Sequence, residues 1–464
     1  MSTTDRTASG EASGTPLRSH DAAFLRRSTP DAPMNVGGFI TFEPSPRPLT
    51  LERVRELVGA RLDLLPRFRQ RIVVVDDAPQ WVDHDRFDID AHIDEAPLDR
   101  SDRGLHRFLA TLHATELDAH RPLWSLTLVP ASATAGPALF FRASHVLVDG
   151  LSSMHVMRSL FDPIGRTDGT TTRSTEPDDA EADEVGVADV LSDLWSTLRP
   201  GRPATLDPDA YDRAITLLDG WVSILDRSQH GMPRFAGSGP VRQRVGLAEL
   251  PSAPLRRLRR DLDLRFDELC LTIVGGALAR RFGATDPVEP EARIRTLVPV
   301  AGAARRSRSS LGNRASFLLI ALPIGPMPID RRLAIVREEI GEAVASGQHR
   351  AAAFGLRALE RLPVDPSGRQ ADAMADRRFV DLVVSCIPGS RRRLRFDGHD
   401  HDVTFPLLPV TRTVRVAIGI GDIGGRLGVS IAADDRALPE IDFVLDAMTR
   451  ATGDLLAAHG TTAS

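Results

Sequence analysis

The spacing of hydrophobic positions predicts alternating helices and strands in the first third of the chain. Apolar residues recur with helical periodicity at residues 51–62 and 105–112, and Pro66 is expected to end the first of these helices. Two apolar runs, residues 126–129 and 138–141, are separated by turn-forming residues, which predicts a hairpin. Further elements are expected as strands at residues 39–42 and 71–75 and as a helix at residues 151–160.

The pattern changes at residues 167–184, where Thr, Ser, Asp and Glu replace almost all apolar residues. This composition is typical of a flexible, acidic linker. Residues 189–229 regain a helical pattern, which Pro200 and Pro203 interrupt. A second series of elements begins at Pro240. It comprises expected strands at residues 294–300, 317–322 and 379–385, a hairpin formed by residues 414–420 and 427–432, and helices at residues 273–280, 333–344 and 441–456.

Two patterned regions around a linker predict a two-domain α/β protein, because 464 residues exceed the size of one ordinary core. The polar residues 1–16 carry no apolar signal core and are expected to form a disordered tail. We expect an N-terminal domain at residues 17–166, the linker with connecting helices at residues 167–235, and a C-terminal domain at residues 236–464.

Composition narrows the functional classes. All 58 basic residues are arginine, which excludes Schiff-base chemistry on lysine and lysine-dependent phosphate loops. A net charge of −5 gives no reason to expect general affinity for nucleic acid. Cys270 and Cys386 alone cannot build a disulfide framework or a CxxC metal site, which fits a reducing cytoplasm. No run of 18 apolar residues occurs, so no membrane-spanning helix is expected.

One segment carries a candidate for acid–base chemistry, Ser144-His145-Val146-Leu147-Val148-Asp149-Gly150. An imidazole suits proton removal near neutral pH, because its ordinary pKa is about 6.5. His145 follows an apolar strand and precedes a helix, and ligands commonly bind at such junctions. Asp149 could fix the local backbone or pair with an arginine, and Gly150 permits unusual backbone angles. By itself the HxxxDG string is short, and a lone histidine is more often structural than catalytic.

Several landmarks accompany this motif in a fixed order. They are Ser19-His20-Asp21-Ala22-Ala23-Phe24-Leu25 with Asp31-Ala32-Pro33-Met34-Asn35-Val36-Gly37, Leu65-Pro66-Arg67-Phe68-Arg69-Gln70-Arg71, Phe87-Asp88-Ile89-Asp90-Ala91-His92, Pro122-Leu123-Trp124, Leu311-Gly312-Asn313-Arg314, Pro388-Gly389 and Ala433-Asp434. Together they resemble the bacterial wax ester synthase/diacylglycerol acyltransferase family over nearly the whole chain.

The resemblance implies two domains like those of chloramphenicol acetyltransferase, with mixed sheets and an active site at the domain interface. It also implies that His145 is the general base and that Asp149 organises the loop around it. The remaining positions expected to shape the motif or to position substrate are Ser144, Gly150, Trp124, Asn313 and Ser385.

The reaction implied by the resemblance is O-acyl transfer from a long-chain acyl-CoA to diacylglycerol or a fatty alcohol, with no cofactor and no metal. The expected partners are acyl-CoA and a lipid alcohol. A cytoplasmic protein is expected, with peripheral contact to a membrane or lipid droplet as a further expectation.

Some positions differ from the family pattern. Ser144 stands where the family has the first His of HHxxxDG, and Asn35 replaces the His of its Met-His-Val-Gly segment. Asp267-Glu268 aligns with its Asn-Asp pair, and Cys386 interrupts its Ser-Asn-x-Pro-Gly-Pro segment. Two alternatives therefore stay open. One is acyl transfer from a carrier protein to another hydroxyl or amine, and the other is a non-catalytic lipid-binding or regulatory paralogue.

Other signals have plainer interpretations. Residues 419–424 spell GxGxxG, but the strand-like residues that follow favour a glycine-rich hairpin over a dinucleotide site. Residues 397–402 contain potential metal ligands, although a solvated loop is expected. Arginines cluster at residues 305–308 and 391–395, where a solvated face or contact with CoA phosphates or anionic lipid is expected. Cys386 ends an apolar strand and is expected to be buried and inert.

Overall fold

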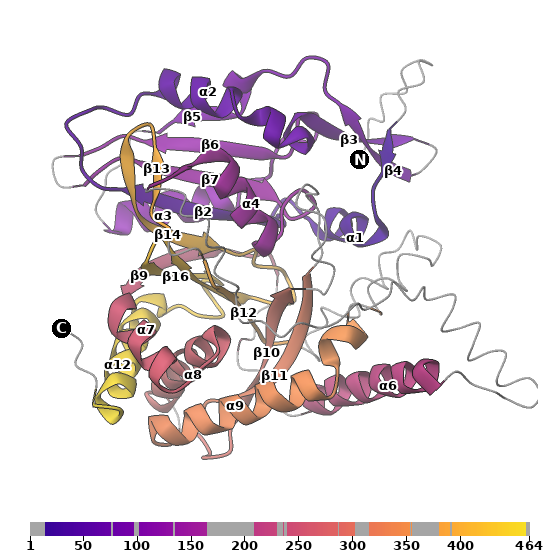
Figure 1. The fold of residues 1–464 in the computed structure, drawn as a ribbon, viewed down its shortest axis with the longest axis vertical. Coiled ribbons are helices and arrows are strands. Elements are labelled where there is room, and N and C mark those ends of the chain that lie inside the picture. The colour runs from indigo at the N-terminus through magenta and orange to yellow at the C-terminus, as the bar shows by residue number, and fades with distance from the viewer. Residues whose placement is uncertain are drawn as a thin grey trace, which may run out of the picture.

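The computed structural model describes residues 14–75, 78–96, 102–132, 135–164, 208–229, 235, 239–285, 287–301, 315–352, 354, 380–389 and 392–460. The described residues up to 164, indigo to purple in Figure 1 and called the first half below, form the upper part of the molecule. The second half begins with α6 (Pro208–Gln229). Most of the second half forms the lower part. Each part is built around a sheet that carries helices, which confirms the predicted two-part α/β fold.

A seven-stranded sheet forms the centre of the first half. Its order is β5 (Ile93–Glu95), β6 (Trp124–Val129), β7 (Ala138–Ser144), β2 (Asn35–Phe42), β14 (His399–Leu407), β13 (Leu394–Phe396) and β8 (Asp162–Pro163). β5 and β6 run parallel, whereas the other neighbours are antiparallel, so the sheet is mixed. β6 and β7 form the predicted hairpin.

Helices cover both faces of this sheet. α2 (Leu51–Gly59) and α4 (Gly150–Leu160) bury apolar side chains against the face that carries Leu139 and Phe141. α3 (Asp102–His113) packs on the opposite face, against Phe140. Successive side chains of a strand point to opposite faces, which explains this alternation along β7. The other elements of this half are α1 (Ser19–Arg27), the small sheet of β1 (Thr15–Pro16), β4 (Ala78–Asp83) and β3 (Gln70–Val75), and the 3-10 helices η1 (Leu62–Leu64), η2 (Pro66–Arg69) and η3 (Ile89–Ala91).

A six-stranded mixed sheet forms the centre of the second half. Its order is β11 (Ala315–Pro323), β10 (Arg293–Ala301), β12 (Leu382–Ile387), β15 (Val416–Ile423), β16 (Arg426–Asp434) and β9 (Gln243–Leu250). β12 runs parallel to both of its neighbours. α8 (Phe266–Gly283) is apolar on nearly every side because the sheet, α9 (Ile329–Ala345) and α12 (Ile441–Ala458) enclose it. α7 (Ser252–Asp261) contacts α12, and α6 (Pro208–Gln229) contacts β11.

β14 connects the two sheets. It belongs to the second half in sequence but pairs with β2 of the first sheet. It also lies against β15 and β16, where glycines leave room for its backbone. A Cβ atom on Gly419 would lie 2.4 Å from the Pro406 carbonyl oxygen, and one on Gly428 would lie 2.2 Å from the Thr404 carbonyl oxygen. Residues 394–407, which the predicted boundaries assign to the C-terminal domain, are therefore part of the first sheet.

The glycine-rich segment at residues 419–424 lies in a β-hairpin, as predicted. Strand β16 follows it, whereas a dinucleotide site would require a helix. Gly424 and Gly425 form the two-residue turn with φ angles of 64° and 90°. Positive φ at both positions is the requirement of the tight turn that best matches the twist of a hairpin.

Two predictions about irregular segments are wrong. Residues 397–402 do not form a solvated loop, because Asp397 and Gly398 make the β13–β14 turn and His399 and His401 are buried in β14. Thr15–Pro16 does not continue a disordered tail but pairs with β4.

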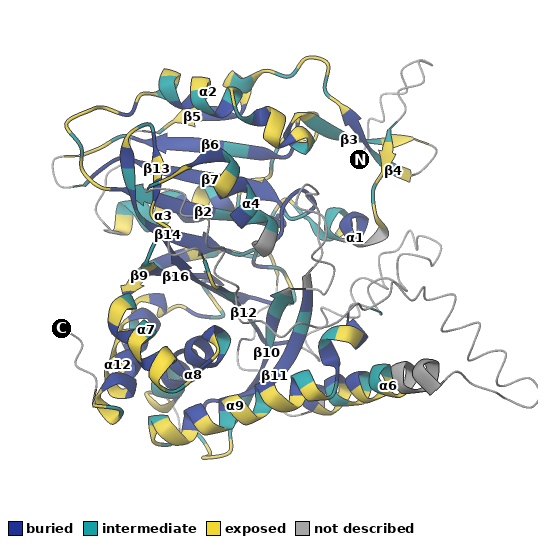
Figure 2. Cartoon of the chain, viewed as in Figure 1, coloured by how far each residue is buried: buried dark blue, intermediate teal, exposed yellow. Residues whose placement is uncertain are grey.

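Most predicted helices and strands lie within a few residues of the observed ones. The helix expected at residues 51–62 already ends at Gly59, and β12 begins at Leu382. The linker at residues 167–184 and the helical pattern at residues 189–207 lie outside the described residues. Buried residues concentrate in the strands and on the inward faces of the helices (Figure 2). None of the helices that the structure describes is long and apolar enough to span a bilayer.

Candidate active site

A cavity of about 310 Å³ is lined by residues of both halves. β2, β7 and α4 contribute to it from the first half, and β10, β11 and β12 contribute from the second. Its walls are mostly apolar. The polar side chains that described residues place on them belong to Arg26, Arg27, His145, Asp149, Ser153, Ser316, Ser385, Thr404 and Thr411. An apolar cavity with a few convergent polar groups is typical of a binding site for a largely apolar ligand.

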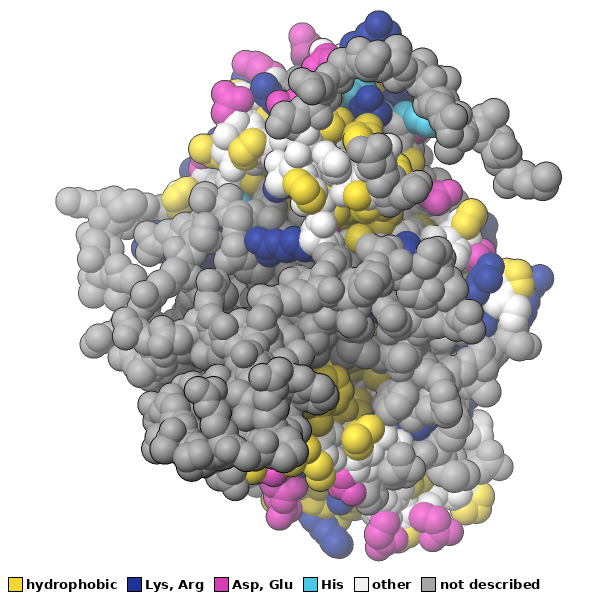
Figure 3. Space-filling model, turned by 90° about the vertical axis from the view of Figure 1, so that its right-hand side faces the viewer, with side chains coloured by type: hydrophobic (Ala, Val, Ile, Leu, Met, Phe, Trp, Pro, Cys, Tyr) yellow, Lys and Arg dark blue, Asp and Glu magenta, His cyan; other side chains and the backbone are white. Residues whose placement is uncertain are grey.

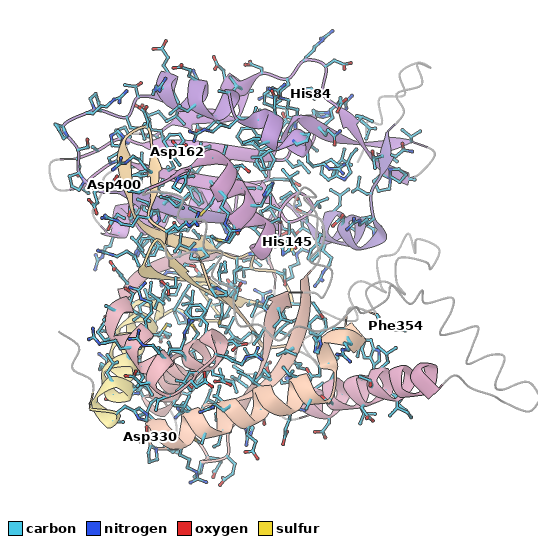
Figure 4. All side chains as sticks on the ribbon, in the orientation of Figure 1. His84, His145, Asp162, Asp330, Phe354 and Asp400 are labelled. Carbon is cyan, nitrogen blue, oxygen red and sulfur yellow. The ribbon has the colours of Figure 1, made fainter. Side chains whose placement is uncertain are left out.

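The cavity lies between the two parts of the molecule. Figure 4 places His145 at their junction. On the face in Figure 3, hydrophobic side chains reach the surface near the middle, within the area that undescribed residues leave visible. The predicted position of His145, facing a space between two halves, is therefore confirmed by the cavity lining.

His145 is the first residue after β7. Its backbone N–H donates a hydrogen bond to the Met34 carbonyl oxygen at 2.7 Å, which ties the strand end to the residue before β2. Its imidazole stacks on the ring of Phe24 from α1, with ring centroids 4.2 Å apart and planes only 3° from parallel. Both side chains line the cavity. An imidazole in this position can exchange a proton with a ligand in the cavity.

Asp149 caps the helix that follows His145. Its Oδ1 accepts hydrogen bonds from the backbone N–H and the hydroxyl of Ser152, both at 2.7 Å. The Asp149 backbone N–H donates in return to Ser152 Oγ at 2.7 Å. Such reciprocal bonds satisfy backbone groups that the first turn of a helix leaves without partners. Asp149 therefore fixes the turn between His145 and α4, of which Gly150 is the first residue.

Ser144 lies beside His145 but does not line the cavity. Its side chain is buried, and its Oγ accepts a hydrogen bond from the Val146 backbone N–H at 3.3 Å. Its carbonyl oxygen accepts from the N–H groups of Leu147 and Val148. Ser144 thus stabilises the turn through its side chain and its carbonyl oxygen, and it is not among the residues that line the cavity.

Trp124 also lies away from the cavity. Its indole N–H donates to the Phe68 carbonyl oxygen at 2.9 Å, and its ring stacks on His92 with centroids 4.6 Å apart. His92 Nδ1 is 2.9 Å from the Trp124 carbonyl oxygen, and burial lowers the pKa of His92. Three sequence landmarks therefore meet in one aromatic stack, which packs the first half and does not touch substrate space.

The second half supplies Ser385, which is buried on β12 and lines the cavity. Asn313, the other predicted position of this half, lies outside the described residues. Asp267 and Glu268 are not on the cavity wall. Glu268 accepts from the Arg265 backbone N–H at 3.0 Å at the start of α8, and burial raises its pKa.

The two cysteines meet on the other side of β12. The Cys386 side chain is a hydrogen-bond partner of the Cys270 thiol, and burial, reinforced by this contact, raises the pKa of Cys270 well above its ordinary value. Cys386 is only partly buried, so the prediction of a buried residue was wrong in that respect. Cys386 does not line the cavity, because neighbouring positions of a strand face opposite sides.

Within the described part of the chain, no three His, Cys, Asp or Glu side chains gather so that they could hold a metal ion. His401 lies in β14 with its Nε2 atom 2.8 Å from Thr404 Oγ1, and burial lowers its pKa to about 4. Arg393 and Arg395 of the second arginine cluster pair with Glu43 and Asp400.

Several cavity residues were missed from the sequence. Phe24 lies in the first of the sequence landmarks, but the sequence predicts no role for it. Its contact with His145 depends on how α1 packs against the end of β7. Arg26 and Arg27 at the end of α1 line the cavity as well. Thr404 and Thr411 reach it from the segment that connects the two sheets.

Two family models match the chain. Residues 17–200 match the wax ester synthase/diacylglycerol acyltransferase catalytic domain, and residues 311–455 match the C-terminal domain of the same family. A probable diacylglycerol O-acyltransferase of Mycobacterium tuberculosis is 24% identical over 457 residues, which cover 94% of this chain and 93% of the relative. A second probable diacylglycerol O-acyltransferase of that species is 23% identical over 472 residues, covering 95% of this chain and 98% of the relative.

Solved structures share the fold. The wax ester synthase/diacylglycerol acyltransferase from Marinobacter aquaeolei VT8 superposes with a TM-score of 0.64 at 18% identity, covering 96% of this chain and all of that one. The first condensation domain of the calcium-dependent antibiotic synthetase gives a TM-score of 0.60 at 15% identity, covering 97% and 98%. Taken with the matched residues and the fold, these findings show that the chain belongs to the wax ester synthase/diacylglycerol acyltransferase family.

Proposed function

We propose that this protein transfers a long-chain acyl group from acyl-CoA to the hydroxyl group of diacylglycerol or a fatty alcohol. Membership of the family and the names of full-length relatives support this reaction class. The observation that carries the proposal is the position of His145 on the wall of an apolar cavity between the two halves.

In the proposed mechanism His145 acts as the general base. Its neutral imidazole takes the proton of the acceptor hydroxyl while the hydroxyl oxygen attacks the thioester carbon. A tetrahedral oxyanion forms, the carbon–sulfur bond breaks, and the imidazolium returns the proton to the CoA sulfur. We propose Ser385, on the wall contributed by the second sheet, as a hydrogen-bond donor to the reacting substrate. One such donor contributes about 3 kcal/mol when it meets the developing oxyanion.

The surroundings of His145 suit this chemistry. Apolar walls accept alkyl chains and keep water away from the thioester, which limits hydrolysis. Arg26 and Arg27 are basic residues on the part of the wall that the structure describes, and we propose that they lie close to the phosphates of CoA.

The non-catalytic alternative draws on the replaced motif residues, above all Ser144. The Ser144 hydroxyl belongs to the buried turn, so this replacement removes no polar group from the cavity wall. Asp267 and Glu268 are likewise away from it. The positions that differ from the family pattern therefore leave the polar groups of the cavity in place, which favours an active enzyme.

We also propose peripheral contact with a membrane or lipid droplet. α6 supports this proposal because it carries an apolar stripe of Ile215, Leu218, Val222 and Leu225, which are between 38% and 58% exposed. The opposite side of α6 packs through Ile224 against Val380 and Val414, two residues of the cavity wall. A lipid surface on the exposed side would thus lie close to the cavity that receives lipid substrates.

The test compares purified wild-type protein, His145→Ala and His155→Ala. His155 is a matched control because it lies on α4 and is not part of the cavity lining. With palmitoyl-CoA and either hexadecanol or dioleoylglycerol, we expect ester formation by the wild type and by His155→Ala. His145→Ala should lose about 10²–10⁴-fold in kcat, the usual contribution of a general base.

Other outcomes of this experiment would replace the proposal. Full activity of His145→Ala would remove His145 from the mechanism. Faster transfer from a palmitoyl carrier protein than from palmitoyl-CoA would identify a different donor. Binding of diacylglycerol without turnover of any donor would identify a non-catalytic paralogue.

A further inference from the structure

We infer that Phe24 is a positioning residue for His145, which holds the plane of the imidazole and stabilises its protonated form. This inference rests on the proposed role of His145 as the general base. Phe24 comes from α1, far from the HxxxDG segment in sequence, and the two rings meet on the cavity wall.

The stacking geometry restricts how the imidazole can turn. The rings are 4.2 Å apart between centroids and 3° from parallel. A rotation of the imidazole out of this plane would drive its edge into the phenyl ring. Phe24 therefore fixes the plane in which the two imidazole nitrogens lie, and a general base needs its proton acceptor aimed at the substrate hydroxyl to within a small angle.

A closed series of contacts holds Phe24 and His145 next to each other. The Ser28 backbone N–H donates to the Phe24 carbonyl oxygen at 3.1 Å, and the Met34 N–H donates to Ser28 Oγ at 3.2 Å. The His145 N–H then donates to the Met34 carbonyl oxygen at 2.7 Å. The ring stack completes the series, so the backbone on both sides of the stack is fixed independently of the rings.

The second half of the chain anchors the same segment. Asp31, between Ser28 and Met34, forms a bidentate ion pair with Arg412 at 2.6 and 3.0 Å. The Arg412 guanidinium lowers the pKa of Asp31 to about 2. The Val241 backbone N–H also donates to Asp31 at 3.3 Å. The segment that carries Phe24 is thus held against both halves that enclose the cavity.

The phenyl face also acts electrostatically. Its negative quadrupole attracts the imidazolium that forms when His145 takes the substrate proton. Among the described residues, the charged side chains that share the cavity wall with His145 are Arg26, Arg27 and Asp149. A substitution of Phe24 leaves these three charges unchanged, so it isolates the contribution of the aromatic ring.

The experiment compares Phe24→Leu, which keeps an apolar side chain without a ring, with Phe24→Tyr, which keeps the ring. Leu25→Ala is the matched control, because Leu25 packs from the same helix into the core of the first half and does not line the cavity. The readouts are kcat and KM for palmitoyl-CoA across pH, melting temperature, and the NMR titration of the ring-labelled His145 imidazole, assigned by its loss in His145→Ala.

For Phe24→Leu we expect kcat to fall about tenfold or more, with a smaller change in KM, because the base is misaimed. The acidic limb of the kcat profile and the NMR titration of His145 should move together to lower pH by roughly half a unit, because the imidazolium loses its aromatic neighbour. Phe24→Tyr should restore both the rate and the titration to near wild-type values.

An unchanged titration and rate in Phe24→Leu would overturn the inference. So would a loss of rate that matches the fall in melting temperature seen in Leu25→Ala and leaves the titration unmoved, since that pattern describes a structural residue only. If no variant and no wild type transfers acyl groups, the proposed function fails, and the NMR titration still decides whether Phe24 acts on the His145 imidazole.

Discussion

His145 and Asp149 stand four positions apart in one motif but have separate tasks. His145 faces the cavity, whereas Asp149 bonds to Ser152 and starts α4. The sequence drew attention to both positions, because an imidazole suits proton removal and a carboxylate can fix the local backbone, and the family resemblance implied their separate roles. It could not predict the partner of His145, since Phe24 reaches it only through the packing of α1.

Substitution of Asp149 tests this division at the level of a single residue. Asp149→Ala removes the acceptor for two hydrogen bonds and should lower the free energy of unfolding by about 1 kcal/mol, as measured by urea denaturation. It should also lower kcat, because the turn that follows His145 loosens. Asp149→Asn keeps an acceptor oxygen and should cost less in both measurements.

The matched control for Asp149 is Ser159→Ala, on the same helix but away from its first turn. It should leave both stability and rate near wild-type values. An Asp149→Ala protein with the stability and rate of the wild type would show that the cap does not organise the site.

At the scale of elements, apolar periodicity predicted most helices and strands. It failed where tertiary contacts decide the structure of a segment. The sequence predicts a polar loop at residues 397–402, yet His399 and His401 are buried because β14 pairs within the first sheet and lies against β15 and β16. Two glycines of the β15–β16 hairpin fall within its predicted strands, and the sequence predicts no separate role for them. Gly419 and Gly428 also admit the backbone of β14, a contact that no local pattern contains.

Replacing one of these glycines tests whether the position requires glycine because the backbone of β14 lies too close for a Cβ atom. Gly428→Ala would bring a Cβ atom to 2.2 Å from the Thr404 carbonyl oxygen, so the strands must shift. We expect a loss of about 1–3 kcal/mol in unfolding free energy, measured in urea.

Gly341→Ala is the matched control in α9, because its Cβ would meet nothing within 4 Å. That substitution should stabilise the protein by about 0.5–1 kcal/mol, since alanine loses less conformational freedom in a helix. A Gly428→Ala protein as stable as Gly341→Ala would contradict the close approach of the β14 backbone to Gly428.

At the scale of the whole molecule, the two-part α/β fold was predictable. The sequence did not predict that strands from the second half belong to the first sheet. Segment order along the chain suggests two separate domains, but β13 and β14 return to the first sheet. The cavity follows from this arrangement, because β14 carries Thr404 to a wall that strands of both sheets complete. Sequence landmarks located the motif, and only the tertiary fold brought Ser385 to the same cavity.

The orientation of the molecule on lipid can be tested through α6. Leu218 and Val222 are 58% and 56% exposed, and four of the seven large exposed hydrophobic residues among the described residues belong to this helix. The double variant Leu218→Ser/Val222→Ser should bind about tenfold more weakly to vesicles of phosphatidylcholine and diacylglycerol, measured by flotation, because less apolar surface enters the lipid.

Leu64→Ser is the control for that measurement, since Leu64 is 60% exposed on η1 in the first half. It should bind vesicles as the wild type does. Equal binding by all three proteins would exclude α6 as the contact with lipid.

The pairing of β2 with β14 joins residues far apart in the chain, such as Thr41 and Asp402, which are 361 positions apart and share a hydrogen bond. A ribosome releases β2 long before it has made β14. During that interval β2 can pair with β7, while its other edge exposes backbone groups that readily pair with foreign strands. Nearly the whole chain must therefore be synthesised before the first sheet is complete. A chain terminated before residue 399 permanently leaves this edge of β2 without its partner strand.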